Sequence, residues 1–194
     1  MEKNKENYLE FKVPVRQNAE WITNLREEMG SENVPVRWKN GWYHITVAFI
    51  KGDQHVEAIK MAFGKILFNT KAPQLTLNKV GVFKARIRNE LIINLTSSAP
   101  SERFMSLVGS LRSEVEKIGV NLESDFLLHI TLGWIDADMA SLEEVEKVVN
   151  KIVVPPFTLT IKDAEYRYQK GDSKRSNSRK DDSIQKYPLK RPSI

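Results

Sequence analysis

The chain has 194 residues, and 30 Lys or Arg against 25 Asp or Glu give it a formal net charge of +5 at pH 7. It has no cysteine and only three histidines, which excludes disulfides, a thiol nucleophile and thiolate-bound metal, and argues against a histidine-rich metal cage. We therefore expect no metal and no other cofactor, and the modest basic excess favours a phosphate-bearing partner.

Length and composition are those of one folded domain, which we expect to span residues 1–194. The first residues are charged and lack the apolar stretch of a secretory signal, and no run of about 18 uncharged apolar residues occurs in the chain. We expect a cytoplasmic protein that is a monomer and has no membrane partner.

Apolar spacing in the first part of the chain predicts a strand at 8–15, a helix at 19–29, strands within 36–50 and a helix at 56–68. Asn40-Gly41 is the strongest turn signal in the sequence. We therefore expect a hairpin whose second arm begins at Trp42.

The rest of the chain predicts strands at 74–83 and 90–95, a helix at 101–118, a strand at 126–134, a helix from 141 and strands at 157–168 and about 183–189. Between the last two strands lies a basic loop at about 170–182, for which a solvated loop and a nucleic-acid contact both stay open. Strands and helices alternate in two similar passes, which predicts an α+β or α/β domain with an internal repeat.

Two windows of this pattern look alike: WYHITVAFI from Trp42 and FLLHITLGW from Phe126. Side chains alternate between the faces of a strand, so His44 and Thr46 share one face, and His129 and Thr131 do the same in the second window. The opposite faces are apolar and are assigned to the core: Tyr43, Ile45, Val47 and Phe49 in the first window, and Leu128, Ile130, Leu132 and Trp134 in the second.

A single strand histidine is usually structural, and His55 has no context that suggests another role. A matched pair of His-x-Thr segments is different. Cleavage of a phosphodiester needs one proton removed and another supplied, and histidine can do both near neutral pH. The threonine hydroxyls can donate hydrogen bonds to the nonbridging oxygens, so no metal is required.

The paired segments resemble the signatures of the 2H phosphoesterase superfamily, which includes the bacterial 2′-5′ RNA ligase or RNA 2′,3′-cyclic phosphodiesterase type. The strand-helix opening, GVF at 81–83 and the HITLGW ending also follow that layout, over about residues 8–189. The resemblance implies a bilobal α+β fold: two antiparallel sheets with a pseudo-two-fold repeat, helices packed outside and a site between the lobes.

By the same resemblance, His44 and His129 are the catalytic acid and base, in an order that the near-symmetric windows leave open. Thr46 and Thr131 are the phosphate ligands. The implied enzyme is a cyclic phosphodiesterase or 2′-5′ phosphodiesterase that acts without metal on RNA 3′ ends or nucleotides, with RNA ligation as the reverse reaction.

The chain departs from this family after the second motif, where Gly133-Trp134 replaces the Gly-Arg of many bacterial members. We consider Arg86, Arg88 and Lys51 as replacements for the missing charge. Two aromatic residues, Trp42 and Phe83, are candidates to stack on a base.

Two other functions stay open at this point. The same site could hydrolyse a small signalling oligonucleotide, or the chain could be a module that binds a nucleotide without turnover. The intact pair of motifs favours catalysis, since mere binding does not call for two acid-base groups.

Overall fold

The computed structural model describes residues 6–16, 19–86, 88–122, 125–169 and 182–190, and within them the chain forms ten strands and four helices. Apart from Asp182, the predicted basic loop at 170–182 lies outside the described residues. The α+β class and the two antiparallel sheets with helices outside are confirmed.

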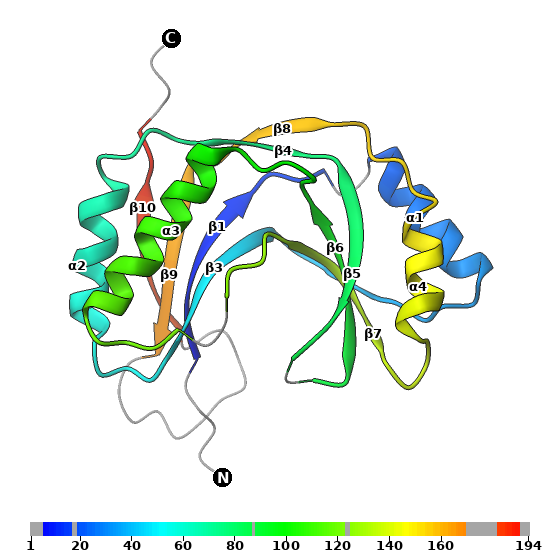
Figure 1. Ribbon diagram of the computed structural model, residues 1–194, viewed down its shortest axis with the longest axis horizontal. Helices are drawn as coiled ribbons and strands as arrows, with labels where there is room; N and C mark the ends of the chain where they lie inside the picture. Colours follow the sequence, from blue (N-terminus) through cyan, green and yellow to red (C-terminus); the bar gives the residue numbers. More distant parts are fainter. Residues whose placement is uncertain (1–5, 17–18, 87, 123–124, 170–181, 191–194) are drawn as a thin grey trace.

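The first lobe is a four-stranded antiparallel sheet in the order β10-β9-β1-β3. Its strands are β10 (Asp182–Pro188), β9 (Asp163–Gln169), β1 (Glu6–Val13) and β3 (Tyr43–Lys51). Two helices, α2 (Val56–Leu67) and α3 (Glu102–Lys117), cover its outer face (Figure 1). None of the four described helices lies on the opposite face of this sheet.

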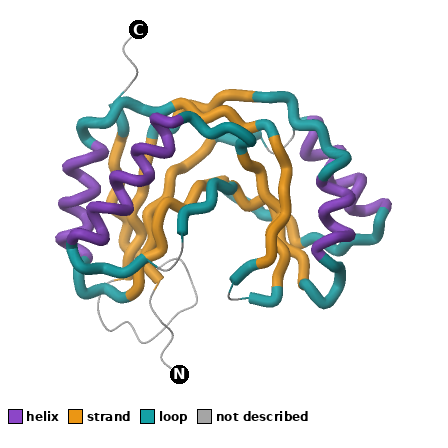
Figure 2. The backbone as a smooth tube through the Cα atoms, in the orientation of Figure 1, coloured by secondary structure: helices purple, strands orange, loops and turns teal. Residues whose placement is uncertain are grey.

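The second lobe is a four-stranded antiparallel sheet in the order β2-β7-β6-β5. Its strands are β2 (Arg37–Trp38), β7 (Ile130–Asp136), β6 (Glu90–Thr96) and β5 (Lys79–Lys84). The helices α1 (Glu20–Ser31) and α4 (Leu142–Val149) lie on its outer side, so each lobe has one sheet and one pair of helices (Figure 2).

A small ladder of β4 (Gln74–Leu77) with β8 (Phe157–Thr160) runs between the two lobes along one side of the molecule (Figure 1). It divides two of the predicted strands. The segment 74–83 becomes β4, which pairs with β8, and β5, which pairs with β6; between them, the backbone N–H of Asn78 donates to the carbonyl of Thr96. The segment 157–168 likewise becomes β8 and β9.

Local signals fix the helix ends where the sequence predicts them. Ser141 and Glu144 form both hydrogen bonds of a capping box at the start of α4. At α3, the Ser101 hydroxyl accepts from the backbone N–H of Phe104, and Gly119, with φ of 86°, follows the last turn. The apolar stripe of α3 is buried along the first sheet.

The hairpin predicted at Asn40-Gly41 is wrong. The arms join different sheets, since β2 pairs with β7 and β3 pairs with β1. The turn residues instead carry the chain between lobes, and Gly41 has φ of 90°. Packing decides this: Gly133 has no side chain, so Val36 and Trp38 lie against β7 there.

The strand predicted at 126–134 is shorter than expected and begins at Ile130. Both strands that carry a motif contain a β-bulge. On β3, Val47 is an extra residue between the pairs Leu9–Ala48 and Glu10–Thr46. One extra residue resets the alternation of faces. Phe49 therefore leaves the core face to which the sequence assigned it, and its ring contacts Tyr8.

The same irregularity recurs on β7. There, Leu132 is the extra residue between the pairs Ile93–Gly133 and Asn94–Thr131. Trp134 was predicted in the core and instead lies half-buried on the face that carries Thr131. A bulge directly follows the His-x-Thr segment in both places. The predicted pseudo-two-fold repeat is therefore visible in the strand pairing itself.

No helix within the described ranges combines the length and apolar character needed to cross a bilayer.

Gly133→Ala should destabilise the fold, because a Cβ there would lie 2.8 Å from Val36 Cγ1 and 3.2 Å from the carbonyl oxygen of Arg37. We expect a loss of about 1–3 kcal/mol in the free energy of unfolding, measured by urea denaturation. Gly109→Ala is the control, since nothing lies within 4 Å of its Cβ position on α3. Equal effects of the two substitutions would contradict this explanation.

Candidate functional site

The two His-x-Thr segments lie on strands that approach each other where the lobes meet. β3 and β7 are in contact although they belong to different sheets. On each strand the residues before and after the histidine and threonine are buried toward the helices. His44, Thr46 and Thr131 are half-buried and occupy the faces that the helices leave open.

His44 lies beside a buried carboxylate. Its Nδ1 is 3.6 Å from Oε2 of Glu10, and its side chain is 19% exposed. The residue opposite it on β1 is Lys12, and Glu10 stands opposite Thr46. The first motif therefore lies against two charged side chains that share one face of β1.

These charges belong to a network on β1 and β9. The guanidinium of Arg167 donates from Nε to Glu10 at 3.0 Å and from Nη2 to Glu165 at 2.9 Å. Lys12 Nζ lies 2.8 Å from the second oxygen of Glu165. Burial raises the pKa of Glu10, and the Arg167 guanidinium partly opposes that shift.

Trp42 covers the cationic part of this network. Lys12 Nζ is 4.9 Å and Arg167 Cζ is 5.2 Å from the ring centroid. These are cation–π distances, which hold the indole in place. The ring remains 46% exposed, so it offers a flat apolar surface next to His44.

His129 has different surroundings. It immediately precedes β7, and its Nδ1–H donates to the carbonyl oxygen of Leu127 at 2.9 Å. The Phe83 ring meets the imidazole edge-on, with centroids 5.1 Å apart. Burial lowers the pKa of His129, and the bond to Leu127 partly opposes the shift. With Nδ1 occupied as a donor, the neutral ring carries its lone pair on Nε2.

One polar residue beside the second motif gave no signal in the sequence. Asn94, on β6, pairs with Thr131 across the ladder and is only 4% exposed. Its side chain lies over Gly81, where a Cβ would be 3.5 Å from Oδ1. Its Nδ2 donates one hydrogen bond to the carbonyl oxygen of Ile92 at 3.4 Å, and the amide has a second N–H.

The three predicted cations lie at the ends of strands. Arg86 and Arg88 are exposed on the connection between β5 and β6, and Arg88 lies 4.0 Å from Glu90. Lys51 ends β3, seven residues from His44, which is about 23 Å along a strand.

Lys12 lies opposite His44, and Arg167 binds the same Glu10 carboxylate that His44 approaches; the sequence analysis missed both cations. A signal existed, because Glu10-x-Lys12 and Glu165-x-Arg167 place charges on a single face of otherwise apolar strands. In the part of the chain that the structure describes, no three His, Cys, Asp or Glu side chains cluster as metal ligands would.

Residues 13–92 match the family model described as LigT like phosphoesterase, a range that includes the first motif and ends before the second. No curated protein sequence matches the chain. The resemblance to the 2H phosphoesterase superfamily is thus supported by a family pattern that is independent of the second motif.

Solved structures extend the likeness over nearly the whole chain. Escherichia coli LigT complexed with NADP+ is 18% identical, with 96% of this chain and 99% of that chain covered and a TM-score of 0.60. E. coli LigT complexed with 3′-AMP is 18% identical, with 95% and 98% covered and a TM-score of 0.56. Kluyveromyces marxianus Usb1 with uridine monophosphate is 10% identical, with 95% and 98% covered and a TM-score of 0.64. The predicted resemblance is confirmed.

Arg167→Met should cost about 3–5 kcal/mol of unfolding free energy at pH 7, because it leaves Glu10 as a buried charge without its main partner. The pKa of Glu10 is raised in the fold, so this penalty applies above that pKa and disappears as the pH falls through it. The loss, measured by urea unfolding, should therefore shrink between pH 7 and pH 4.

Lys151→Met is the matched control, because Lys151 also lies between two glutamates, Glu28 and Glu32, but at the surface. Its loss should be at most about 1 kcal/mol. If both variants lose the same free energy, or the Arg167 effect does not depend on pH, Arg167 does not compensate a buried Glu10 charge.

Proposed function

With the fold of the LigT-like phosphoesterases as the premise, we propose that this chain is a metal-independent phosphoesterase that hydrolyses ribose 2′,3′-cyclic phosphates or 2′-5′ phosphodiester bonds in RNA or nucleotides. One observation carries the proposal: two His-x-Thr segments lie at equivalent positions, each before a bulge, on strands that contact each other. The nucleotides bound to the related structures, 3′-AMP and uridine monophosphate, support a substrate of this class.

His129 is the general base in this proposal. Its Nδ1–H is held by the carbonyl of Leu127, so Nε2 is the atom that accepts a proton. Burial lowers the pKa of the ring and so favours its neutral form. A neutral imidazole with a fixed tautomer can take a proton from the water that attacks phosphorus.

His44 is then the general acid. The Glu10 carboxylate, 3.6 Å from Nδ1, stabilises a positive imidazolium by direct charge attraction. The water oxygen bonds to phosphorus, the bond from phosphorus to one ribose oxygen breaks, and that oxygen takes the proton of His44. The water's own proton goes to His129, so the step consumes one water and leaves a phosphomonoester.

The remaining residues stabilise the charge on phosphorus. The hydroxyls of Thr46 and Thr131 donate to the two nonbridging oxygens, and Asn94 supports the second of them. Lys12, opposite His44 on β1, supplies positive charge on the same side as the leaving oxygen. Trp42 and Phe83 flank the two histidines and offer apolar surfaces to the nucleoside.

His44→Ala and His129→Ala should each lower kcat/KM by about 10²–10⁴-fold, because each removes one proton-transfer group. The assay uses a panel of 2′,3′-cyclic mononucleotides, cyclic-phosphate-ended RNA and 2′-5′ oligoadenylate, with chelator present throughout. His55→Ala is the control and should keep full activity, since His55 lies at the start of α2.

Full activity in either motif variant would refute two-histidine catalysis, and loss of activity in chelator would refute metal independence. Nucleotide binding without hydrolysis at any pH from about 5 to 9 would instead identify a binding module of the same fold.

The value of kcat/KM should stay high to lower pH than it would with an ordinary imidazole base. The base must be unprotonated, and the pKa of His129 is lowered from 6.5, so the acid limb should lie below pH 6.5. Proton NMR titration of the imidazole signals, with His55→Ala used for assignment, gives the pKa directly. An acid limb above pH 6.5 would remove His129 from the role of base.

A further inference from the structure

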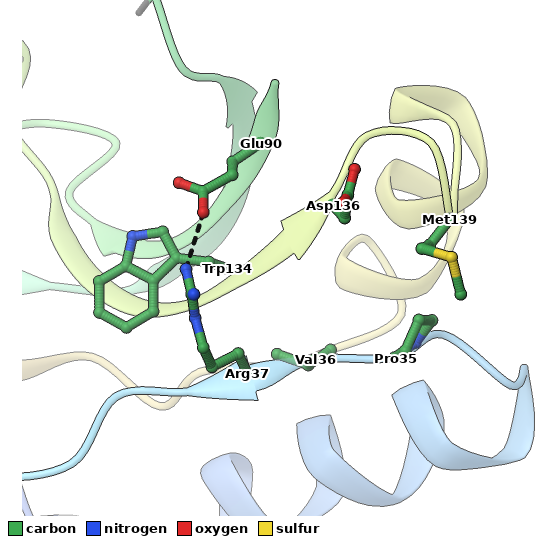
Figure 3. Close-up of a pocket in the computed structure, with 7 residues that line it drawn as sticks. All are labelled: Pro35, Val36, Arg37, Glu90, Trp134, Asp136 and Met139. Atoms are coloured by element: carbon green, nitrogen blue, oxygen red, sulfur yellow. Dashed lines mark hydrogen bonds and ion pairs between the residues drawn. The ribbon is translucent and has the colours of Figure 1, made fainter. Parts of the chain in front are cut away.

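We propose that the pocket beside Trp134 is a nucleobase subsite for a nucleotide next to the phosphate at the two histidines. This inference rests on the proposed function and narrows its substrate to an oligonucleotide. The pocket has a volume of about 420 Å³ and seven lining residues, which are Pro35, Val36, Arg37, Glu90, Trp134, Asp136 and Met139 (Figure 3). Small-ligand pockets of about 300–1,000 Å³ are typical.

The bulge at Leu132 connects this pocket to the candidate catalytic face. Without the bulge, Trp134 would point toward the helices; with it, Trp134 and Asp136 follow Thr131 on one side of β7. Trp134 is three residues from Thr131, about 10 Å along a strand. The pocket therefore begins on the same face of β7 as Thr131, further along the strand.

Arg37 forms the flat wall of the pocket. Its Nη2 donates to Oε1 of Glu90 at 2.7 Å, and its Cζ is 5.2 Å from the Trp134 ring centroid. Figure 3 shows the guanidinium standing between the indole and the rest of the pocket, directed toward Glu90. Two partners thus fix the orientation of this plane, and unpaired bases stack on Arg planes as they do on aromatic rings.

The other walls suit the remaining surfaces of a base. Pro35 and Val36 are apolar, and Met139, 64% exposed, has a flexible thioether that can adapt to a ring. Asp136 is the hydrogen-bond acceptor that would face the edge of the base. Its Oδ1 already accepts from the backbone N–H of Asp138 at 3.0 Å. A carboxylate accepts hydrogen bonds only, so it can bond the exocyclic amino group of adenine and repels the exocyclic carbonyl oxygens of uracil.

The test compares two substrates that share the cleaved group: a 2′,3′-cyclic mononucleotide, and a dinucleotide that ends in the same cyclic phosphate and carries adenine at its other position. Arg37→Ala should reduce the ratio of kcat/KM for the dinucleotide to that for the mononucleotide about tenfold. Arg26→Ala is the control and should leave the ratio unchanged, because Arg26 covers Trp38 on the helix side of β2.

Two further variants separate stacking from charge and edge recognition. Arg37→Lys keeps the positive charge and loses the guanidinium plane, so the ratio of kcat/KM for the dinucleotide to that for the mononucleotide should fall as it does for Arg37→Ala. If Arg37→Lys keeps the parent ratio, the effect of Arg37 is electrostatic only, and the stacking subsite is overturned. Asp136→Asn adds a hydrogen-bond donor, so the preference for adenine over uracil in the dinucleotide should drop several-fold. An unchanged preference would overturn the assignment of the edge.

Failure of the subsite can be told apart from failure of the proposed function. An equal loss of activity on both substrates in Arg37→Ala would overturn the subsite while the phosphoesterase stands. If the parent chain cleaves neither substrate, its affinities for the adenine dinucleotide and for AMP, measured by calorimetry, test the subsite instead. A tenfold loss of dinucleotide affinity in Arg37→Ala supports the subsite, and unchanged affinity overturns it.

Discussion

The whole arrangement depends on one constraint, that a β-strand covered by helices on a single side gives alternate side chains to the core and leaves the others outside. Both four-stranded sheets obey it, with α2 and α3 on one and α1 and α4 on the other. The polar residues of two apolar strands are thereby displayed without disturbing either core. A bulge after each motif then changes which side chains join them, and it moves Phe49 and Trp134 out of the core.

The charges beside His44 are stable because they compensate one another. Arg167 bridges the buried Glu10 and Glu165, and Lys12 forms an ion pair with Glu165. Four charged groups are therefore tolerated at a place where a single unpaired charge would be strongly destabilising. Replacement by apolar residues could give a core of similar stability. Their arrangement around one imidazole is therefore better explained by the proposed chemistry than by stability.

The sequence predicted the secondary structure well where the signal was local, and failed where partners distant in the chain decided the outcome. The capping box at Ser141 and the stop at Gly119 needed only neighbouring residues. The Asn40-Gly41 hairpin failed because Gly133, far along the chain, offers β2 a closer fit. Strict alternation misplaced Trp134, since a bulge is visible only once the partner strand is known. Lys12 and Arg167 needed the pairing of β1 with β9 and β3.

The near-identical motifs could not be told apart in sequence, and what separates them is what other strands bring to each. β1 and β9 supply His44 with a carboxylate and two cations, whereas β5 supplies His129 with a phenyl ring and its own loop supplies a carbonyl. A charged setting can hold a proton ready for release, and an apolar one keeps an imidazole free to accept a proton. The pseudo-two-fold fold thus places two equal groups at equivalent positions, and their differing surroundings match the opposite roles that the proposed cleavage assigns to them.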